Sequence, residues 1–242
     1  MLSTLTLTGI VESYDYFSKV WWSQKNEKFL LKEDWCDALQ ADKFGHFFAS
    51  YVLADYYQNL LLWANFDTAK AKCISFFATS IYEIIFVELT DGFTTKWGFS
   101  ISDVLCDLLG SYFATYSSLN KRIEFKISYT PSKSSWLNYI TKGSLKDALY
   151  RKQITTDYDG MTFWIIYNKN WIINPAIGYS IENVYKANAY REFFLSFDFN
   201  LIKIIPTKSK ELFLIKKFLN YFHLPSPALQ IYPYFKFYLF FF

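Results

Sequence analysis

The sequence predicts an α+β protein, in which an N-terminal three-helix core carrying a polar cluster precedes a C-terminal, aromatic-rich antiparallel β-sheet. Three observations predict this class. Between residues 42 and 116, long apolar segments alternate with short polar breaks, as expected for packed helices. After residue 121, shorter runs of aromatic and β-branched residues are typical of strands. The 242 residues also include 26 Phe, 20 Tyr and 8 Trp, which supply ample apolar surface for a core.

The change of pattern near residue 120 divides the chain into three regions. Residues 1–41 form an N-terminal arm, whose aromatic side chains we expect to pack on the core. Residues 42–120 form the helical core, and residues 121–242 form a β-rich region with a helix near 208–222. No internal repeat or low-complexity linker separates these regions, so they are compatible with one continuous domain.

The helices of the core are predicted at residues 42–63, 69–90 and 101–116. In the first, Gly45, Ala49 and Ala54 are small enough to let another helix approach closely. The second begins at the natural N-cap Asp67 or Thr68. Gly92 is a natural stop for the second helix. The third helix begins with a capping box from Ser100 to Asp103.

The second helix is unusually apolar. From Cys73 to Leu89 its only formal charges are Glu83 and Glu88. A segment of this length is at the lower limit of what crosses a bilayer, so two interpretations remain. A buried core helix is the favoured one, and a membrane span is the alternative.

The second half of the chain is predicted to contain five strands, at residues 122–129, 161–167, 176–184, 191–205 and 229–242. Residues 131–157 are polar and are expected to form a loop or a surface helix. Pro225 and Pro227 stop the helix near 208–222. The last strand is nearly all aromatic and ends in Phe242, a feature of outer-membrane barrels, but five strands are too few for a closed one. A buried or interfacial sheet is therefore favoured.

Composition and motifs exclude several classes of function. A net charge of +3 with a pI near 8.5 is too mild for nucleic-acid binding. The eight glycines are dispersed, so there is no phosphate-binding loop, and Gly98-Phe99-Ser100 is not a nucleophile elbow. Cys36, Cys73 and Cys106 form no CxxC motif and are expected to be buried free thiols.

The polar residues of the helical half are spaced to meet. Asp42 and His46 are four apart and share a helix face, as do Asp103 and Asp107. Glu88 and Asp91 lie three apart at the end of the second helix. If the three helices pack together, these groups converge, and the candidate catalytic residues are then Asp42, His46, Glu88, Asp91 and Asp103.

Three interpretations of this cluster stay open. The first is a structural network of caps and hydrogen bonds. The second is acid–base catalysis, because clustered carboxylates raise one another's pKa. The third is a divalent metal site for zinc, manganese or iron, with His46, Glu88 and Asp91 as ligands, although one histidine is few for zinc. We expect His223 to lie outside the site and Lys43 to point toward solvent or lipid headgroups.

Four motifs of the helical half, Asp-Lys-x-x-His, Glu-x-x-Asp-Gly-Phe, Trp-Gly-Phe-Ser and Asp-x-x-x-[Asn/Asp]-x-x-Gly, resemble a known family. It is the YfiM-like family of predicted periplasmic lipoproteins of unknown function, in its long, Bacteroidetes-type version. The matching residues are Asp42, Lys43, His46, Glu88, Asp91, Gly92, Phe93, Trp97, Gly98, Phe99, Ser100, Asp103 and Gly110. The chain departs from the pattern at Asp107, where Asn is expected. Residues 159–160, 191–198 and 224–229 match more weakly, and the motif spacing is distantly similar to the VanZ-like integral membrane proteins.

The resemblance implies a bacterial cell-envelope protein, at the outer membrane or facing the periplasm, and it supplies no reaction or cofactor. The leading functional prediction is a structural or accessory, membrane-associated protein. The alternatives are a lipid- or glycan-acting hydrolase that uses the cluster, and a partner subunit of an envelope complex. The expected partners are membrane lipid or an envelope protein. Met1 to Ile10 lack the features of a signal peptide, so we expect either an upstream start or insertion through the protein's own helices.

Overall fold

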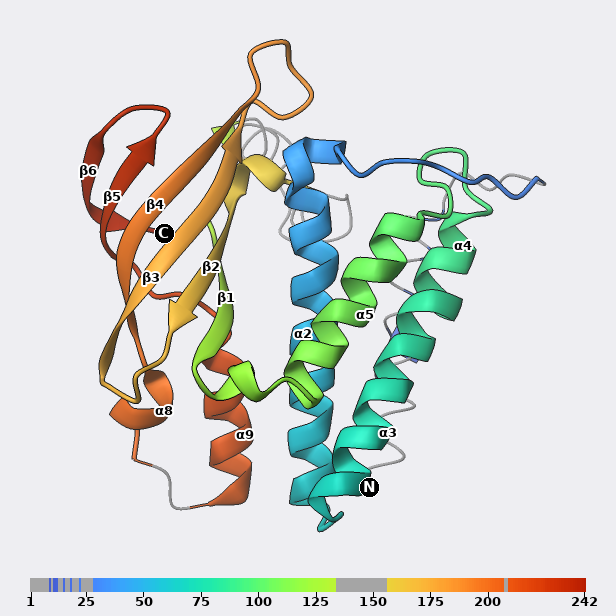
Figure 1. The fold of residues 1–242 in the computed structure, drawn as a ribbon, viewed down its shortest axis with the longest axis vertical. Helices are drawn as coiled ribbons and strands as arrows, with labels where there is room; N and C mark the ends of the chain where they lie inside the picture. Colours follow the sequence, from blue (N-terminus) through green and yellow to red (C-terminus); the bar gives the residue numbers. More distant parts are fainter. Residues whose placement is uncertain are drawn as a thin grey trace.

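The computed structural model describes residues 28–133, 156–206 and 209–242, together with the single positions 9, 11, 12, 15, 18 and 22. In this part of the chain, a group of helices lies beside a six-stranded antiparallel sheet, which confirms the α+β class (Figure 1). Most of the predicted N-terminal arm and most of the predicted loop or surface helix at 131–157 lie outside the described residues.

The three predicted core helices are present. They are α2 (Ala41–Trp63), α3 (Thr68–Ile81) with its continuations η2 (Tyr82–Glu88) and α4 (Leu89–Asp91), and α5 (Ile101–Thr115). Asp67 caps α3 by accepting from the backbone N–H of Lys70 at 2.9 Å, and Ser100 caps α5 by accepting from that of Asp103 at 3.2 Å. The predicted capping residues therefore set the helix starts. A short 3-10 turn, η1 (Asp37–Gln40), leads into α2.

Helix α2 lies between the sheet and α5 (Figure 1). Gly110 permits the close approach of α5, because a Cβ there would lie 2.2 Å from the carbonyl oxygen of Phe47. Two turns further along α2, the carbonyl oxygen of the buried Ala54 accepts a hydrogen bond from the Ser75 hydroxyl of α3. The predicted helix contact at Gly45 is wrong: no described atom lies within 4 Å of a Cβ built there.

The sheet runs in the order β1-β2-β3-β4-β5-β6, with each strand antiparallel to the next. Its strands are Ile123–Tyr129, Met161–Tyr167, Ile173–Glu182, Tyr190–Phe199, Ser226–Tyr232 and Lys236–Phe241. Two predictions are corrected. The segment 229–242 belongs to two strands, because Pro233 at the turn cannot donate a ladder hydrogen bond. The strand predicted at 191–205 ends at Phe199, and the chain continues into α8 (Leu201–Ile204).

The connections around the sheet include three more short elements. They are η3 (Ser118–Lys121) before β1, η4 (Tyr158–Gly160) before β2, and α9 (Lys210–Leu219), which corresponds to the helix predicted near 208–222.

Aromatic side chains join the sheet to α2. The ring of Phe44 lies 5.8 Å from that of Phe163 and 4.8 Å from that of Tyr179, measured between centroids. The opposite face of the sheet buries a second cluster that includes Trp164 and Phe194. The contact at Phe44 is important for the site, because it holds the first turns of α2 against the start of β2.

Two apolar surfaces remain exposed. Five cross-strand neighbours form a row over β2 to β6: Ile165, Ile177, Leu195, Leu229 and Phe237. Among the described residues, the helix from Thr68 to Asp91 is the one with the length and hydropathy of a membrane span, and a third of its most apolar window is buried. The favoured prediction of a buried core helix therefore holds for one side of this helix only.

Candidate functional site

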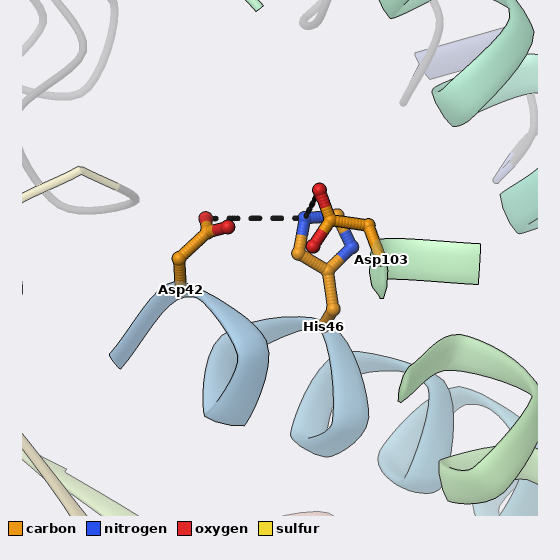
Figure 2. A group of neighbouring side chains, drawn as sticks. All are labelled: Asp42, His46 and Asp103. Carbon is orange, nitrogen blue, oxygen red and sulfur yellow. Dashed lines mark ion pairs between the residues drawn. The ribbon is translucent and has the colours of Figure 1, made fainter. Parts of the chain in front are cut away.

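The predicted polar residues meet where the start of α2 packs against η2 and the start of α5. His46 is at the centre. Its Nε2 atom lies 4.0 Å from Oδ1 of Asp42 and 3.7 Å from Oδ2 of Asp103. Figure 2 shows these two carboxylates, one from α2 and one from α5, paired with the same ring nitrogen. On the other edge of the ring, Nδ1 lies 3.6 Å from Oε1 of Glu88 and 3.3 Å from Oδ1 of Asp107.

Asp91, the fifth predicted residue, lies beside the cluster rather than against the imidazole. It is buried, and its Oδ1 accepts a 2.7 Å hydrogen bond from Nε1 of Trp22 in the N-terminal arm. It lines the same cavity as His46. The structure therefore places three of the predicted acids, Asp42, Glu88 and Asp103, within 4.0 Å of the His46 ring, and Asp91 at the cavity wall.

A π-helical segment explains how the second helix delivers two glutamates to the site. The segment η2 (Tyr82–Glu88) is a π-helix, in which each backbone hydrogen bond joins residues five apart. Positions five apart therefore lie on roughly the same face. Glu83 and Glu88 are five apart, and both are buried, at 6% and 1% exposure. In an α-helix this spacing would separate them. Sequence analysis missed Glu83, although its charge in an apolar helix was a usable signal.

Lys43 corrects a prediction. Instead of pointing to solvent, it is buried, and its Nζ donates to Asp34 at 2.6 Å, Asp42 at 2.9 Å and Asp103 at 2.5 Å. The three carboxylates together offset the desolvation of the ammonium, which no single neighbour in the sequence would do. Asp34 was also missed, and the hydroxyls of Ser100 and Ser102 donate to it.

Asp107, the departure from the family pattern, is fully buried. It accepts a hydrogen bond from Ser50 Oγ at 2.9 Å and faces Nδ1 of His46. The added acid thus has a direct contact with the imidazole.

Carboxylates outnumber cations at this site. Among the described side chains, Lys43 and His46 face the seven acids Asp34, Asp42, Glu83, Glu88, Asp91, Asp103 and Asp107. Burial raises the pKa of Glu88 to about 9 and that of Glu83 to about 8. It raises the pKa of Asp91 to about 7. Burial opposes the charged form of His46 too, but the carboxylates of Asp107, Asp103 and Asp42 outweigh it and raise its pKa well above the usual value.

A cavity of about 310 Å³ opens beside the cluster. Asp42, His46 and Asp91 form its polar end, with the Tyr158 hydroxyl, which donates to Oδ1 of Asp42 at 2.5 Å. The His46 side chain is 20% exposed, so it is accessible from the cavity. The remaining walls are mostly apolar and include Phe48, Val87, Trp97, Met161 and Phe163. Gly45 lies on the same wall, which explains the open space at its Cβ position.

Two groups of side chains in the described part of the chain have ligand atoms close enough to hold a metal ion. They are Asp42, His46 and Asp103, and His46, Glu88 and Asp107; within each group the atoms lie within 4.8 Å of one another. The predicted set of His46, Glu88 and Asp91 is not among them. Asp107 replaces Asp91, because α5 brings Asp107 onto Nδ1 while Trp22 holds Asp91 aside.

The other predicted candidates lie elsewhere or differ in burial. His223 stacks on Trp164 in the sheet half, with ring centroids 4.0 Å apart, so it is outside the site as predicted. All three cysteines are free, as expected. Cys106 is buried, but Cys36 and Cys73 are exposed, so the predicted burial is wrong for these two.

Residues 32–119 match a family described as predicted periplasmic lipoprotein (DUF2279). The matched stretch holds the three core helices and the acids from Asp34 to Asp107, and it ends before the sheet. This match supports an envelope protein of unknown function that faces the periplasm. Comparisons with curated proteins and with solved structures gave no match.

Proposed function

We propose that the protein is a membrane-associated protein of the bacterial envelope that binds an amphiphilic envelope molecule, a lipid or a lipid-linked glycan, and hydrolyses a bond near its polar end. The observation that carries this proposal is the cavity beside the cluster. Its lining includes His46 with the acids Asp42, Glu83 and Asp91, and the remaining walls are mostly apolar. A cavity with this division fits a molecule with a polar head and an apolar chain. The family match supports the location.

The side chains at the polar end have complementary roles in hydrolysis. Asp91, with a pKa raised by burial to about 7, is poised to accept a proton from the attacking water. The Nε2–H of His46 donates a proton to the oxygen that leaves as the substrate bond breaks. Asp42, held by the Tyr158 hydroxyl, orients the imidazole from the Nε2 side. One water is consumed: one product gains its hydroxyl group, and the other gains a proton.

The cavity provides a direct test. The variant Gly45→Leu adds a side chain into open space and fills the cavity, whereas Ala69→Leu adds the same side chain at an exposed position of α3. Purified proteins are incubated with an extract of bacterial envelope lipids, and products are followed by mass spectrometry. We expect product from the wild type and from Ala69→Leu, and none from Gly45→Leu or His46→Gln. Absence of product from the wild type, or equal product from all four proteins, contradicts the proposal.

The exposed apolar surfaces support attachment to a membrane. Phe77, Ile81 and Ile85 are each about half exposed along the outer side of α3 and η2. Exposed apolar surface of this extent is unusual on a soluble monomer and is favourable at a lipid surface. The row on the sheet adds a second apolar surface.

Flotation with phosphatidylethanolamine and phosphatidylglycerol vesicles tests the attachment. The double variant Ile81→Glu/Ile85→Glu places two charges on the outer side and should stay at the bottom of the gradient. The control Thr68→Glu/Ala69→Glu adds the same charges at the exposed start of α3 and should float with the wild type. If the wild type does not float, the apolar surface has another partner. A protein subunit of an envelope complex is then the second candidate, and crosslinking in intact cells identifies it.

A further inference from the structure

We propose that Nδ1 of His46, Oε1 of Glu88 and Oδ1 of Asp107 form a binding site for one divalent transition-metal ion, with Mn²⁺ as its best-fitting representative. The three side chains come from α2, η2 and α5, so the ion would join all three core helices. The inference does not depend on hydrolysis, because ion binding is measured by itself.

The spacing of the three atoms fits a metal ion. Nδ1 lies 3.3 Å from Asp107 Oδ1 and 3.6 Å from Glu88 Oε1, and all three atoms lie within 4.8 Å of one another. Nitrogen and oxygen ligands about 2.1 Å from an ion lie roughly 3 to 3.5 Å apart in tetrahedral or octahedral geometry. Small side-chain movements therefore bring the three atoms to bonding distance.

The state of Glu88 is a second, independent observation. Its side chain is 1% exposed, yet Oε1 accepts no hydrogen bond from the described residues. A buried oxygen without a donor is uncommon and destabilising unless a ligand satisfies it. The other oxygen, Oε2, accepts from the backbone N–H of Ser100 at 3.3 Å, which fixes the direction of Oε1. Oε1 therefore faces Nδ1 of His46 without a partner that an ion would have to displace.

The surroundings also orient the ligands. The Nε2 edge of His46 faces the carboxylates of Asp103 at 3.7 Å and Asp42 at 4.0 Å. Their negative charges favour a proton on Nε2, which leaves the lone pair of Nδ1 for the proposed ion. The ion replaces one proton on Nδ1 and one on the carboxyl of Glu88, and it leaves Nε2–H in place. Ser50 holds Asp107 in the same manner through its hydroxyl.

The alternative group, Asp42, His46 and Asp103, is a weaker choice. Lys43 already binds Oδ2 of Asp42 and Oδ1 of Asp103, and Tyr158 donates to Oδ1 of Asp42. An ion there would lie close to the Lys43 ammonium. By contrast, on the Glu88 side of the imidazole ring the acids outnumber the cations, because Glu83 is also nearby. Two carboxylates with one imidazole suit Mn²⁺, which accepts both kinds of ligand.

Titration with Mn²⁺ tests the site. The full chain is treated with a chelator, exchanged into buffer and titrated at neutral pH, while the electron paramagnetic resonance signal of free Mn²⁺ counts the unbound ion. We expect one Mn²⁺ per chain, with a spectroscopic nitrogen coupling from His46. Glu88→Gln should weaken binding at least tenfold, as loss of a ligand or its supporting partner typically does. The matched control Glu192→Gln makes the same substitution on β4, outside the site, and should bind as the wild type does.

The outcomes are distinct. His46→Gln should lose the nitrogen coupling, and thermal unfolding of each variant shows that the fold is retained. Failure of the wild type to bind Mn²⁺ stoichiometrically overturns the inference, as does a Glu88→Gln variant that binds like the wild type. A protein that binds Mn²⁺ but hydrolyses no envelope lipid supports this inference and contradicts the hydrolase proposal, so the two fail separately.

Discussion

The ammonium of Lys43 lies 2.5 Å from Oδ1 of Asp103, sixty positions later in the chain. The same Nζ atom binds Asp34 before α2 and Asp42 beside it. One buried cation thus joins the segment before α2, α2 itself and the start of α5. The geometry of the His46 cluster depends on this junction, because Asp42 and Asp103 contact both Lys43 and His46.

Lys43→Met should be strongly destabilising. It leaves three buried carboxylates without their cation, and removing one partner of a buried ion pair typically costs about 3 to 5 kcal/mol. Urea unfolding followed by circular dichroism measures the change. Lys70→Met, which removes an exposed partner of Asp67, is the control and should leave the unfolding midpoint unchanged. Equal effects of the two variants would show that the Lys43 junction is not a stability determinant.

Gly110→Ala should separate α5 from α2. The added Cβ would meet the Phe47 carbonyl at 2.2 Å, and backbone cannot move aside as a side chain can. Overpacking of this kind costs about 1 to 3 kcal/mol. Gly45→Ala makes the same change within α2 at a position with open space, and it should stabilise by up to about 1 kcal/mol through helix propensity. Differential scanning calorimetry of both variants tests the contrast; a lower melting temperature for Gly45→Ala than for Gly110→Ala contradicts it.

Deleting Ile85 should be tolerated. The residue is about half exposed within the π-helical segment, and its removal brings Glu83 and Glu88 to a spacing of four, which shares a face in an ordinary α-helix. Ile74 is an exposed residue in the α-helical part of this helix. Its deletion rotates the first turns of α3, before residue 74, relative to the site. We expect the melting temperature to fall further for the Ile74 deletion. The reverse order would mean that the π-helical backbone itself is required.

The contribution of His223 to stability should fall between pH 6.5 and pH 4. Burial, aided by the Lys126 ammonium, lowers the pKa of this imidazole to about 4, whereas in the unfolded chain it is about 6.5. The unfolded state therefore binds the proton first as the pH decreases, which favours unfolding. The effect amounts to about 3 kcal/mol across the window.

The variant His223→Phe isolates this effect, because it keeps a ring over Trp164 and removes the titrating group. Free energies of unfolding from urea titrations at several pH values give the difference between wild type and variant. The difference should be constant above pH 6.5 and change below it. A difference that is constant down to pH 4 would show that His223 protonates as readily in the folded protein.

Local patterns predicted much of the fold. Asp67 and Ser100 cap the helices that their spacing indicated, because an N-cap requires only the chain within three residues of it. The same reasoning failed for the strand at 229–242, where an aromatic run gave no sign of the turn that Pro233 makes. It also failed for the strand at 191–205, because apolar residues of a short helix resemble those of a strand.

The site was predicted in part for the same reason. Asp42 and His46 share a helix face by their spacing alone, and so the sequence placed them together. The burial of Lys43 and the contact of Asp107 with His46 depend on how α5 packs on α2, which no local pattern encodes. Glu83 was missed because its direction follows from a π-helical backbone.

By itself, the sequence determined the fold class, the three helices and three of the acids that surround one imidazole, since helical periodicity and capping act over a few residues. Only the tertiary structure decided which acid faces Nδ1, that Lys43 is buried among three carboxylates, and that an apolar cavity lies beside them. These features arise from contacts between helices far apart in the chain, where close packing at a single glycine sets the positions of side chains dozens of residues away.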